Sequence, residues 1–334
     1  MSSATSTAPH PQKILQFAFG FVPSVAVATA VDLDLFSQIH KGHHTPAQLA
    51  EVCQISERGV RPLLHTLSAL ALVEEKEGEF RLTPDTEMFL VKSSPAYLGG
   101  MLTHQLHHMA QWAHFGEAVK KGTSPLSPVE GDEDKGEFFA SFVGSLYSMN
   151  WPAAQAVAAH LPSCHTALDI GCGSGVWSLA LAKKESGLQV TAVDRARVLD
   201  VTGEFAARFQ CADRYTMRAG NFREVELEPN HYDVAFLGHI LHSEGEEASE
   251  ILVRRLHDSL KPGGILVTAE MVASQPRGEE LFPNLFELNM LMWTEQGCVF
   301  NREQLERMGT QAGFVRHEWI STPSPSPVLL SYKA

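Results

Sequence analysis

The chain has 334 residues, of which 44% are hydrophobic and 19% charged, and its formal net charge at pH 7 is −13. This length predicts about two domains with a sizeable core, and the acidic balance argues against nucleic acid or an anionic membrane surface as the main partner. The five cysteines show no C-x-x-C spacing, which argues against a disulfide framework or a zinc site and suits a reducing compartment.

The N-terminal region predicts a tail followed by helix. Residues 1–11 are rich in Ser, Thr, Ala and Pro, lack the pattern of a secretory signal, and are predicted to form a disordered tail. Residues 13–40 show a helical period of apolar residues, which Pro23 is expected to kink or divide. Proline and two aspartates interrupt the apolar stretch 17–35, so no membrane span is predicted and the protein is expected in the cytoplasm.

A winged-helix pattern comes next. Thr45-Pro46 opens a short helix over 47–52 with a cap residue and a proline at the first position. A second helix is predicted over 60–72. Glu77-Gly78 then predicts a tight turn between two short strands within 73–82.

Winged helices often bind DNA, so the charge of this region matters. Residues 45–92 hold eight acids against five Lys and Arg, and four of the acids lie in the wing itself. A wing that contacts phosphates is expected to be basic. The winged helix, assigned to residues 12–100, is therefore predicted to be a protein–protein module, with a DNA-binding regulator as the weaker alternative.

The rest of the chain predicts a helical linker and then an α/β domain. Residues 101–160 predict several helices with a loop at 121–135, and residues 161–334 predict the α/β domain. A helix over 246–260 is expected to stop at Lys261-Pro262-Gly263-Gly264. The predicted strands cover 166–170, 189–193, 215–219, 231–238 and 264–270, with two further strand-like pieces in 315–333.

The most specific motif is a glycine-rich turn, in which an apolar strand reading A-L-D-I ends in G-C-G-S-G. Gly171, Gly173 and Gly175 let the backbone approach a ligand and adopt dihedrals that side chains resist. The helix that follows favours an anionic group such as a carboxylate. A dinucleotide fingerprint, G-x-G-x-x-G, needs a glycine where Val176 stands. The observed G-x-G-x-G spacing, with Asp169 upstream, is the pattern of S-adenosylmethionine (AdoMet) sites.

The next strand supplies the acid that such a site requires. Residues 188–194 read L-Q-V-T-A-V-D, and Asp194 falls about 20 residues beyond the turn, where an acid binds the ribose hydroxyls. Strand, glycines, helix and acid follow in the order that a nucleotide-type site needs. AdoMet is therefore the predicted cofactor.

These motifs, with others downstream, carry a family resemblance. The chain resembles the plant-type small-molecule O-methyltransferases and their bacterial relatives over about residues 13–334. The motifs in order are Asp169–Gly175, Asp194, Gly220-Asn221-Phe222, His239-Ile240-Leu241-His242, Pro262-Gly263-Gly264 and Ala269-Glu270. The resemblance implies a winged-helix dimerisation domain, a Rossmann-like class I methyltransferase sheet and a homodimer. It also implies that residues 101–160 contribute to the dimer and to the substrate pocket.

The resemblance further implies roles for individual residues. In this family a histidine removes the proton of the acceptor hydroxyl, and the motif places that base at His242, with His239 structural. Histidine suits the role because its ordinary pKa near 6.5 lets it accept and release a proton at neutral pH. Glu270 is expected to orient His242, and an acid that ends an apolar strand is costly unless it is paired or lies in a cleft.

The sequence departs from the family pattern at three places. Ser243-Glu244 stands where most members have Asp-Trp, and Val299 stands where a second acid beside the histidine is expected. Asn221 replaces an acid that meets the adenine amino group, although its carbonyl oxygen can still accept that hydrogen bond. Phe222 and Gly238 complete the predicted cofactor set. Carbon methylation, or a non-methylating lyase or pericyclic role, therefore stays open beside O-methylation.

An apolar, aromatic-rich wall is predicted around a small acceptor that is aromatic or polyketide-like. His104, His107 and His108 share one helical face, but no acid or cysteine accompanies them, so no metal is predicted. The resemblance places the Met-rich segment 288–293 over the substrate. The predicted pocket residues are His104, His108, Trp112, Phe142, Met149, Met290 and Trp293.

Overall fold

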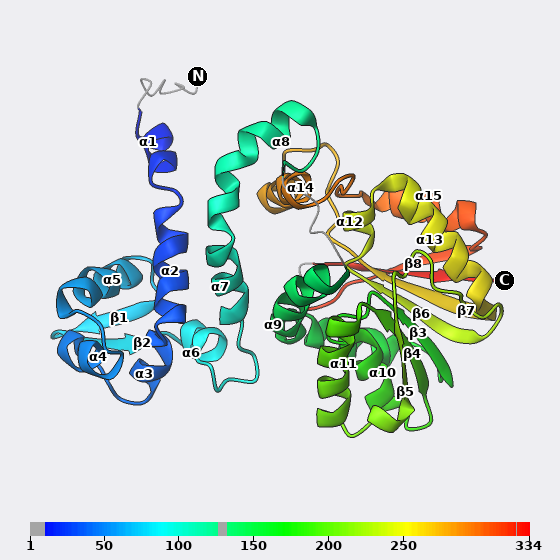
Figure 1. The fold of residues 1–334 in the computed structure, drawn as a ribbon, viewed down its shortest axis with the longest axis horizontal. Helices are drawn as coiled ribbons and strands as arrows, with labels where there is room; N and C mark the ends of the chain where they lie inside the picture. Colours follow the sequence, from blue (N-terminus) through cyan, green and yellow to red (C-terminus); the bar gives the residue numbers. More distant parts are fainter. Residues whose placement is uncertain (1–10, 126–131, 325) are drawn as a thin grey trace, which may run out of the picture. The chain divides into compact units, whose positions relative to one another are not determined.

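The structure is a computed structural model and describes residues 11–125, 132–324 and 326–334. The chain divides into two compact units, Met1–Met109 and Ala110–Ala334 (Figure 1). The tail predicted for residues 1–11 lies outside the described residues, apart from Pro11.

The N-terminal unit is helical with a single described hairpin, as the winged-helix prediction requires. Its helices pack around a core that includes Leu35, Phe36 and Leu64. Thr45 caps α4 through a capping box with Gln48. The elements are α1 (Gln12–Ala18), α2 (Val22–Asp32), α3 (Leu35–His40), α4 (Pro46–Val52), α5 (Glu57–Ala69), β1 (Val73–Lys76), β2 (Glu79–Leu82), α6 (Pro84–Leu90) and α7 (Gly99–His107).

The hairpin forms where the sequence predicted it. Strands β1 and β2 are antiparallel, and Val73 pairs with Leu82. The turn residues Glu77 and Gly78 have φ of 54° and 82°. Both are left-handed, as a two-residue turn that matches the twist of the strands requires.

The first helical segment is divided just before Pro23, as predicted, because α1 ends at Ala18 and α2 begins at Val22. The stretch Ile14–Asp32, which contains most of α1 and all of α2, is long and apolar enough to cross a membrane by length and composition alone. Little of this stretch is buried. Its largest exposed side chains are Ile14, Leu15, Phe17, Phe19 and Phe21.

The C-terminal unit is built on a seven-stranded sheet of order β5-β4-β3-β6-β7-β9-β8. Strands β3 to β7 are parallel, and β9 runs antiparallel to both of its neighbours. This is the predicted Rossmann-like class I sheet. From the end of the first unit onward, the elements are η1 (Met109–His114), α8 (Phe115–Lys121), α9 (Asp132–His160), β3 (Thr166–Ile170), α10 (Val176–Lys184), β4 (Gln189–Asp194), α11 (Ala196–Arg208), η2 (Ala212–Arg214), β5 (Tyr215–Ala219), β6 (Tyr232–Gly238), α12 (Leu241–Glu244), α13 (Glu246–Ser259), β7 (Leu260–Ala269), α14 (Leu281–Trp293), α15 (Arg302–Ala312), β8 (Arg316–Ile320) and β9 (Val328–Tyr332).

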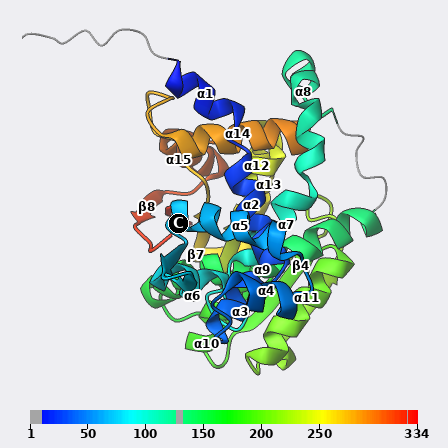
Figure 2. The same cartoon turned by 90° about the vertical axis from the view of Figure 1, so that its left-hand side faces the viewer.

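Helices cover both faces of this sheet (Figure 1). Helices α9, α10 and α11 pack on one face through residues such as Ala154 and Leu179, and α13 and α15 pack on the other through Leu256 and Leu305. Helix α8 packs against α14 (Figures 1 and 2). Because the carboxyl ends of the parallel strands meet at one edge, the residues that follow them gather there.

Several boundaries differ from the prediction; the helix predicted over 60–72, for instance, is α5 at Glu57–Ala69. Helix α9 already begins at Asp132, within the predicted loop 121–135, of which residues 126–131 lie outside the described residues. Strand β7 begins at Leu260, so the predicted stop at 261–264 lies inside the strand as an irregularity between two paired stretches. The backbone there stays paired because Gly264 accepts a hydrogen bond from the amide of Lys333.

Candidate active site

The glycine-rich turn links β3 to α10 at the carboxyl edge of the sheet. Gly171, Gly173 and Gly175 have φ of 60°, 55° and 73°, the left-handed region that only glycine adopts at low cost. A Cβ added at Gly171 would lie 2.3 Å from Cδ1 of Ile240, so the side chain is excluded by packing as well. The turn is thus fixed in a form that exposes backbone rather than side chains.

Asp194 ends β4 beside this turn, as the sequence predicted. Its Oδ2 accepts a hydrogen bond from the amide of Gly173 at 2.9 Å, and its Oδ1 accepts one from the amide of Arg195 at 2.8 Å. Burial raises the pKa of Asp194, and these backbone amides oppose the rise. Each oxygen has two lone pairs, so the carboxylate is held in place while retaining capacity for two hydroxyl donors.

Asp169 provides a direct test of whether the site fits AdoMet. Its side chain is buried, and Oδ2 accepts a hydrogen bond from the hydroxyl of Ser178 at 2.5 Å. Its Oδ1 is buried and has no hydrogen-bond partner among the described residues. Burial raises the pKa of Asp169 to about 7, although the Ser178 hydroxyl opposes the rise. An unsatisfied acceptor below the turn fits a ligand that brings a donor, as the amino-acid end of AdoMet does.

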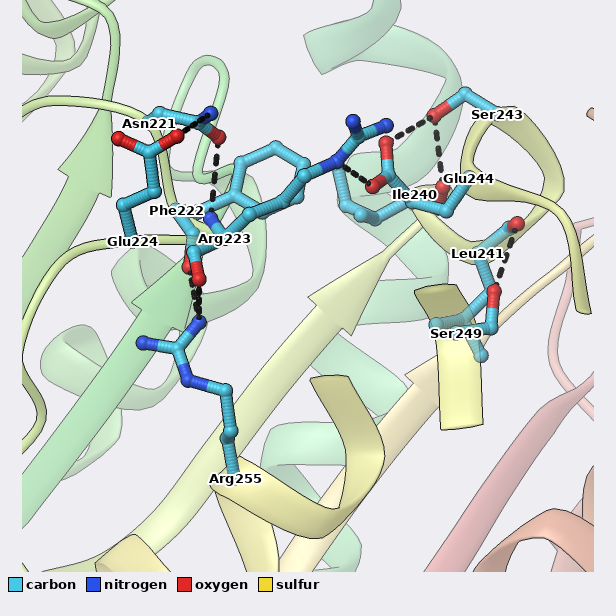
Figure 3. Close-up of polar contacts among 10 residues, drawn as sticks. All are labelled: Asn221, Phe222, Arg223, Glu224, Ile240, Leu241, Ser243, Glu244, Ser249 and Arg255. Atoms are coloured by element: carbon cyan, nitrogen blue, oxygen red, sulfur yellow. Dashed lines mark hydrogen bonds and ion pairs between the residues drawn. The ribbon is translucent and has the colours of Figure 1, made fainter. Parts of the chain in front are cut away.

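The loop after β5 carries Asn221 and Phe222 (Figure 3). The Asn221 carbonyl oxygen accepts a hydrogen bond from the amide of Arg223, and its amide donates to Glu224, both at 3.1 Å. One lone pair of that oxygen is therefore used within the loop, and one remains for a ligand. The ring of Phe222 lies 3.8 Å from the Cβ position of Gly171, which places this loop against the glycine turn.

Gly238 ends β6, and packing explains why it is a glycine. A Cβ there would lie 2.2 Å from Nε1 of Trp177, whose indole fills the space above the strand end. Gly238 therefore leaves room for Trp177, on α10, at the end of β6.

His242 and Glu270 come together at the ends of β6 and β7. The ring Nδ1 of His242 lies 2.7 Å from Oε2 of Glu270, and Oε1 accepts hydrogen bonds from the amides of Leu241 and His242 at 2.7 and 3.4 Å. The Glu270 side chain is 1% exposed and that of His242 is 12% exposed. Burial alone would raise the pKa of Glu270, but His242 and the backbone amides hold it below its ordinary value. The carboxylate is therefore ionised, which favours the tautomer of His242 that carries its proton on Nδ1.

His239 has a different environment from His242. Its Nε2 lies 2.8 Å from the Ser326 hydroxyl, and its backbone is left-handed with φ of 62°. Burial lowers the pKa of His239 to about 4, against the attraction of Glu270. The ring is thus neutral and hydrogen-bonded inside the fold, as a structural role requires.

Backbone and aromatic contacts surround His242 where family members have a second acid. Val299 is buried and brings no charge. Instead the amide of Cys298 donates to the carbonyl of His242 at 2.8 Å. The ring of Phe286, on α14, meets the imidazole edge-on at 4.9 Å between centroids. The sequence reading missed Phe286, although the apolar residues spaced by four along 282–290 were a signal for it.

The predicted pocket residues fall into separate groups. Met290 and Trp293 lie on α14, the helix that brings Phe286 to His242, and Met290 is buried. Phe142 and Met149 lie on α9, whose Val143 is 3.4 Å from the Cβ position of Gly173. Helices α14 and α9 thus each touch the site through a neighbour of the predicted residues.

Three predicted pocket residues lie on other elements. The Trp112 ring, in η1, contacts Phe115 at 5.6 Å between centroids. His104 and His108 belong to the N-terminal unit, with ring centroids 4.6 Å apart. Burial and the neighbouring histidines lower the pKa of His104 to about 4, and burial also lowers that of His108. Among the described residues no group of three or more His, Cys, Asp or Glu side chains could hold a metal ion.

A class I sheet that carries a glycine-rich turn, an acid at the end of the next strand and a buried His–Glu pair at its carboxyl edge defines an AdoMet-dependent methyltransferase. The family follows from direct comparison. A family model of the O-methyltransferase domain matches residues 107–315, and a model of the O-methyltransferase dimerisation domain matches residues 15–92. The chain belongs to the O-methyltransferase family, and AdoMet is its methyl donor.

Similar proteins agree over nearly the full chain. The tetracenomycin polyketide synthesis 8-O-methyl transferase of Streptomyces glaucescens is 27% identical over 97% of both chains. A crystal structure from Nostoc punctiforme, described as that of a candidate O-methyltransferase, is 28% identical, with a TM-score of 0.90 over 98% of this chain and 100% of its own. Human N-acetylserotonin methyltransferase, crystallised with AdoMet, shares the fold with a TM-score of 0.84 at 22% identity, over 99% and 100% of the two chains.

Proposed function

We propose that the enzyme methylates a hydroxyl group of a small aromatic or polyketide-like metabolite, with His242 as the general base and Glu270 as the residue that orients it. The observation that carries this proposal is the 2.7 Å contact between Nδ1 of His242 and Oε2 of the buried Glu270. A fixed base with one nitrogen engaged is what deprotonation of a bound hydroxyl needs.

The path of the proton follows from this contact between His242 and Glu270. Glu270 accepts the Nδ1 proton, so the lone pair of His242 is on Nε2, which takes the proton of the acceptor hydroxyl. The resulting imidazolium is stabilised by the Glu270 carboxylate, and it then releases the proton to solvent. Bound AdoMet supplies an electrophilic methyl group. Holding the acceptor oxygen in line with that methyl provides much of the rate, since proximity is worth about 7–11 kcal/mol.

We assign the methionine, ribose and adenine parts of AdoMet to three groups of residues. The turn Gly171–Gly175 and Asp169 hold the methionine end, and the free lone pairs of Asp194 accept the ribose hydroxyls. The remaining lone pair of Asn221 accepts the adenine amino group, with Phe222 against the ring.

The acceptor class is proposed from the residues around His242 and from the relatives. Phe286, Met290 and Trp293 on α14 offer an apolar, polarisable wall, to which we add Phe142 and Met149 on α9. Trp112, in η1 of the same unit, is proposed to complete it. Such a wall suits a flat hydrophobic ring, and the Streptomyces glaucescens relative is named as an 8-O-methyl transferase of tetracenomycin polyketide synthesis.

The test is to incubate the enzyme with AdoMet and a panel of phenols and hydroxylated polyketide aromatics. The expected products are S-adenosylhomocysteine and an acceptor heavier by one methyl group, which NMR places on oxygen. A methyl on ring carbon, or an acceptor rearranged or cleaved while AdoMet stays intact, would contradict O-methylation.

The enzyme is proposed to act as a cytoplasmic homodimer. The dimerisation-domain match starts at residue 15 and so includes most of the exposed apolar surface of α1 and α2. Phe17 and Phe19 are 75% and 71% exposed, which a second copy of the chain would cover. Light scattering after size exclusion is expected to give the mass of a dimer without detergent. A monomer, or protein recovered only with membranes, would contradict this assignment.

A further inference from the structure

An ion pair joins the loop after β5 to the helix that carries His242 (Figure 3). Nε of Arg223 donates to Oε2 of Glu244 at 2.5 Å. Arg223 lies two residues after Asn221, and Glu244 lies two residues after His242 at the end of α12. The pair therefore connects the side of the site that faces Asp194 with the side that holds the base.

The two partners differ in burial. The Glu244 side chain is 7% exposed, whereas that of Arg223 is 55% exposed. A buried carboxylate without a positive partner is costly. Among the described residues the Ser243 hydroxyl also lies near Oε1 of Glu244, but at 3.5 Å it is too far away to replace the arginine. The pair accordingly raises the pKa of Arg223 above its ordinary value.

Both ends of the ion pair are attached to fixed backbone. Arg255, on α13, donates to the carbonyls of Phe222 and Arg223 at 2.7 and 2.6 Å. On the other side, the Ser249 hydroxyl donates to the carbonyl of Leu241 at 3.1 Å. The ion pair thus links two held segments rather than two mobile surface chains.

These segments also converge on the cofactor turn. The amide of Gly220 donates to the carbonyl of Asp194 at 3.0 Å, which holds the loop beside the ribose-binding acid. Phe222 from the loop and Ile240 from the approach to α12 both pack on Gly171, at 3.8 and 2.3 Å from its Cβ position. A ligand that fixes the position of this loop also restricts the position of the segment that holds His242, because the ion pair between Arg223 and Glu244 connects the two.

We propose that Arg223 and Glu244 are positioning residues that couple AdoMet binding to the placement of His242. Glu244 stands where most members of the family have a tryptophan, so the coupling is specific to chains with this ion pair. The inference rests on the proposed role of His242 for its effect on turnover, but not for its effect on AdoMet affinity.

The experiment is a double-mutant cycle with Arg223→Gln, Glu244→Gln and the double variant. Arg223→Gln leaves a buried charge unpaired and is expected to lower AdoMet affinity by about tenfold or more, and to lower kcat at saturating AdoMet as well. Glu244→Gln removes that charge, so its effect is smaller, and the double variant is expected to recover much of the Arg223→Gln loss. The matched control is Arg307→Gln, which breaks the exposed pair with Glu246 at the start of α13 and is expected to change neither quantity.

AdoMet affinity is measured by calorimetry without acceptor, and thermal unfolding is recorded for each variant. Additive effects across the cycle, or an Arg223→Gln enzyme that matches the control in both affinity and kcat, would overturn the proposal. Calorimetry measures AdoMet binding in the absence of any reaction. Its result therefore tests the affinity coupling even if His242→Ala shows that another group is the base. That separate result would refute the proposed function and leave the affinity coupling standing.

Discussion

Glu270 determines which nitrogen of His242 carries the proton, and Glu270→Gln tests this directly. In the native site Oε2 faces Nδ1 of His242, while Oε1 accepts the amides of Leu241 and His242. Glutamine has the same shape but only one oxygen. If that oxygen keeps accepting the two backbone amides, the NH₂ group of the glutamine faces Nδ1 of His242. Nδ1 must then act as the acceptor. The proton moves to Nε2, and the base is lost.

The competing orientation of the glutamine turns its NH₂ group toward the two amide donors. At a position that is 1% exposed, an unsatisfied donor costs about 1–3 kcal/mol, so the unproductive tautomer is favoured by about fivefold to 150-fold. Loss of the carboxylate also removes stabilisation of the imidazolium. Together these effects are expected to lower kcat by about 10²- to 10⁴-fold.

The assay for Glu270→Gln is the initial rate of S-adenosylhomocysteine formation at saturating AdoMet and acceptor, with AdoMet affinity measured separately. Affinity is expected to stay near the native value, because the side-chain hydrogen bonds that Glu270 makes in the described part of the chain go to Leu241 and His242 and not to the residues assigned to the cofactor. Glu247→Gln, an exposed acid on α13, serves as the control. Native turnover in the Glu270→Gln enzyme would refute the reasoning.

Two further predictions concern the cofactor turn. The pKa of Asp169 is raised from 3.8 to about 7, so the unfolded chain ionises first and stability falls as pH rises between those values. Asp169→Asn is therefore expected to lose less thermal stability than the native enzyme between pH 4 and pH 7, and an equal loss would contradict this. Gly171→Ala forces a Cβ to 2.3 Å from Ile240 at φ of 60° and is expected to lower AdoMet affinity about tenfold or more. Gly187→Ala, which meets open space, should bind AdoMet normally, and equal affinities in the two variants would refute the argument.

Local sequence was enough to predict much of the fold. The strands at 166–170 and 215–219, the Glu77-Gly78 turn and the Thr45 cap all depend on residues within a few positions of one another. The start of β7 was harder, because Leu260 pairs across the sheet with Tyr232. Such pairing depends on contacts distant in the sequence, which no local pattern encodes.

Only part of the site could be predicted from the sequence alone. The glycine turn and Asp194 follow from spacing, while the roles of His242 and Glu270 came from the resemblance. The contact of Phe286 with His242 and the burial of Glu244 against Arg223 arise only when separate elements pack together. The sequence showed Ser243-Glu244 as a departure from the family, but only the fold shows what replaces the missing tryptophan.

The central claim is that His242 removes the acceptor proton, and its most direct test is turnover by His242→Ala at saturating AdoMet and acceptor. We expect AdoMet affinity to be retained and turnover to be almost lost. The matched control is His239→Asn, because asparagine tolerates the left-handed backbone at that position, and this variant is expected to keep most of its activity. Native turnover by His242→Ala would contradict the account.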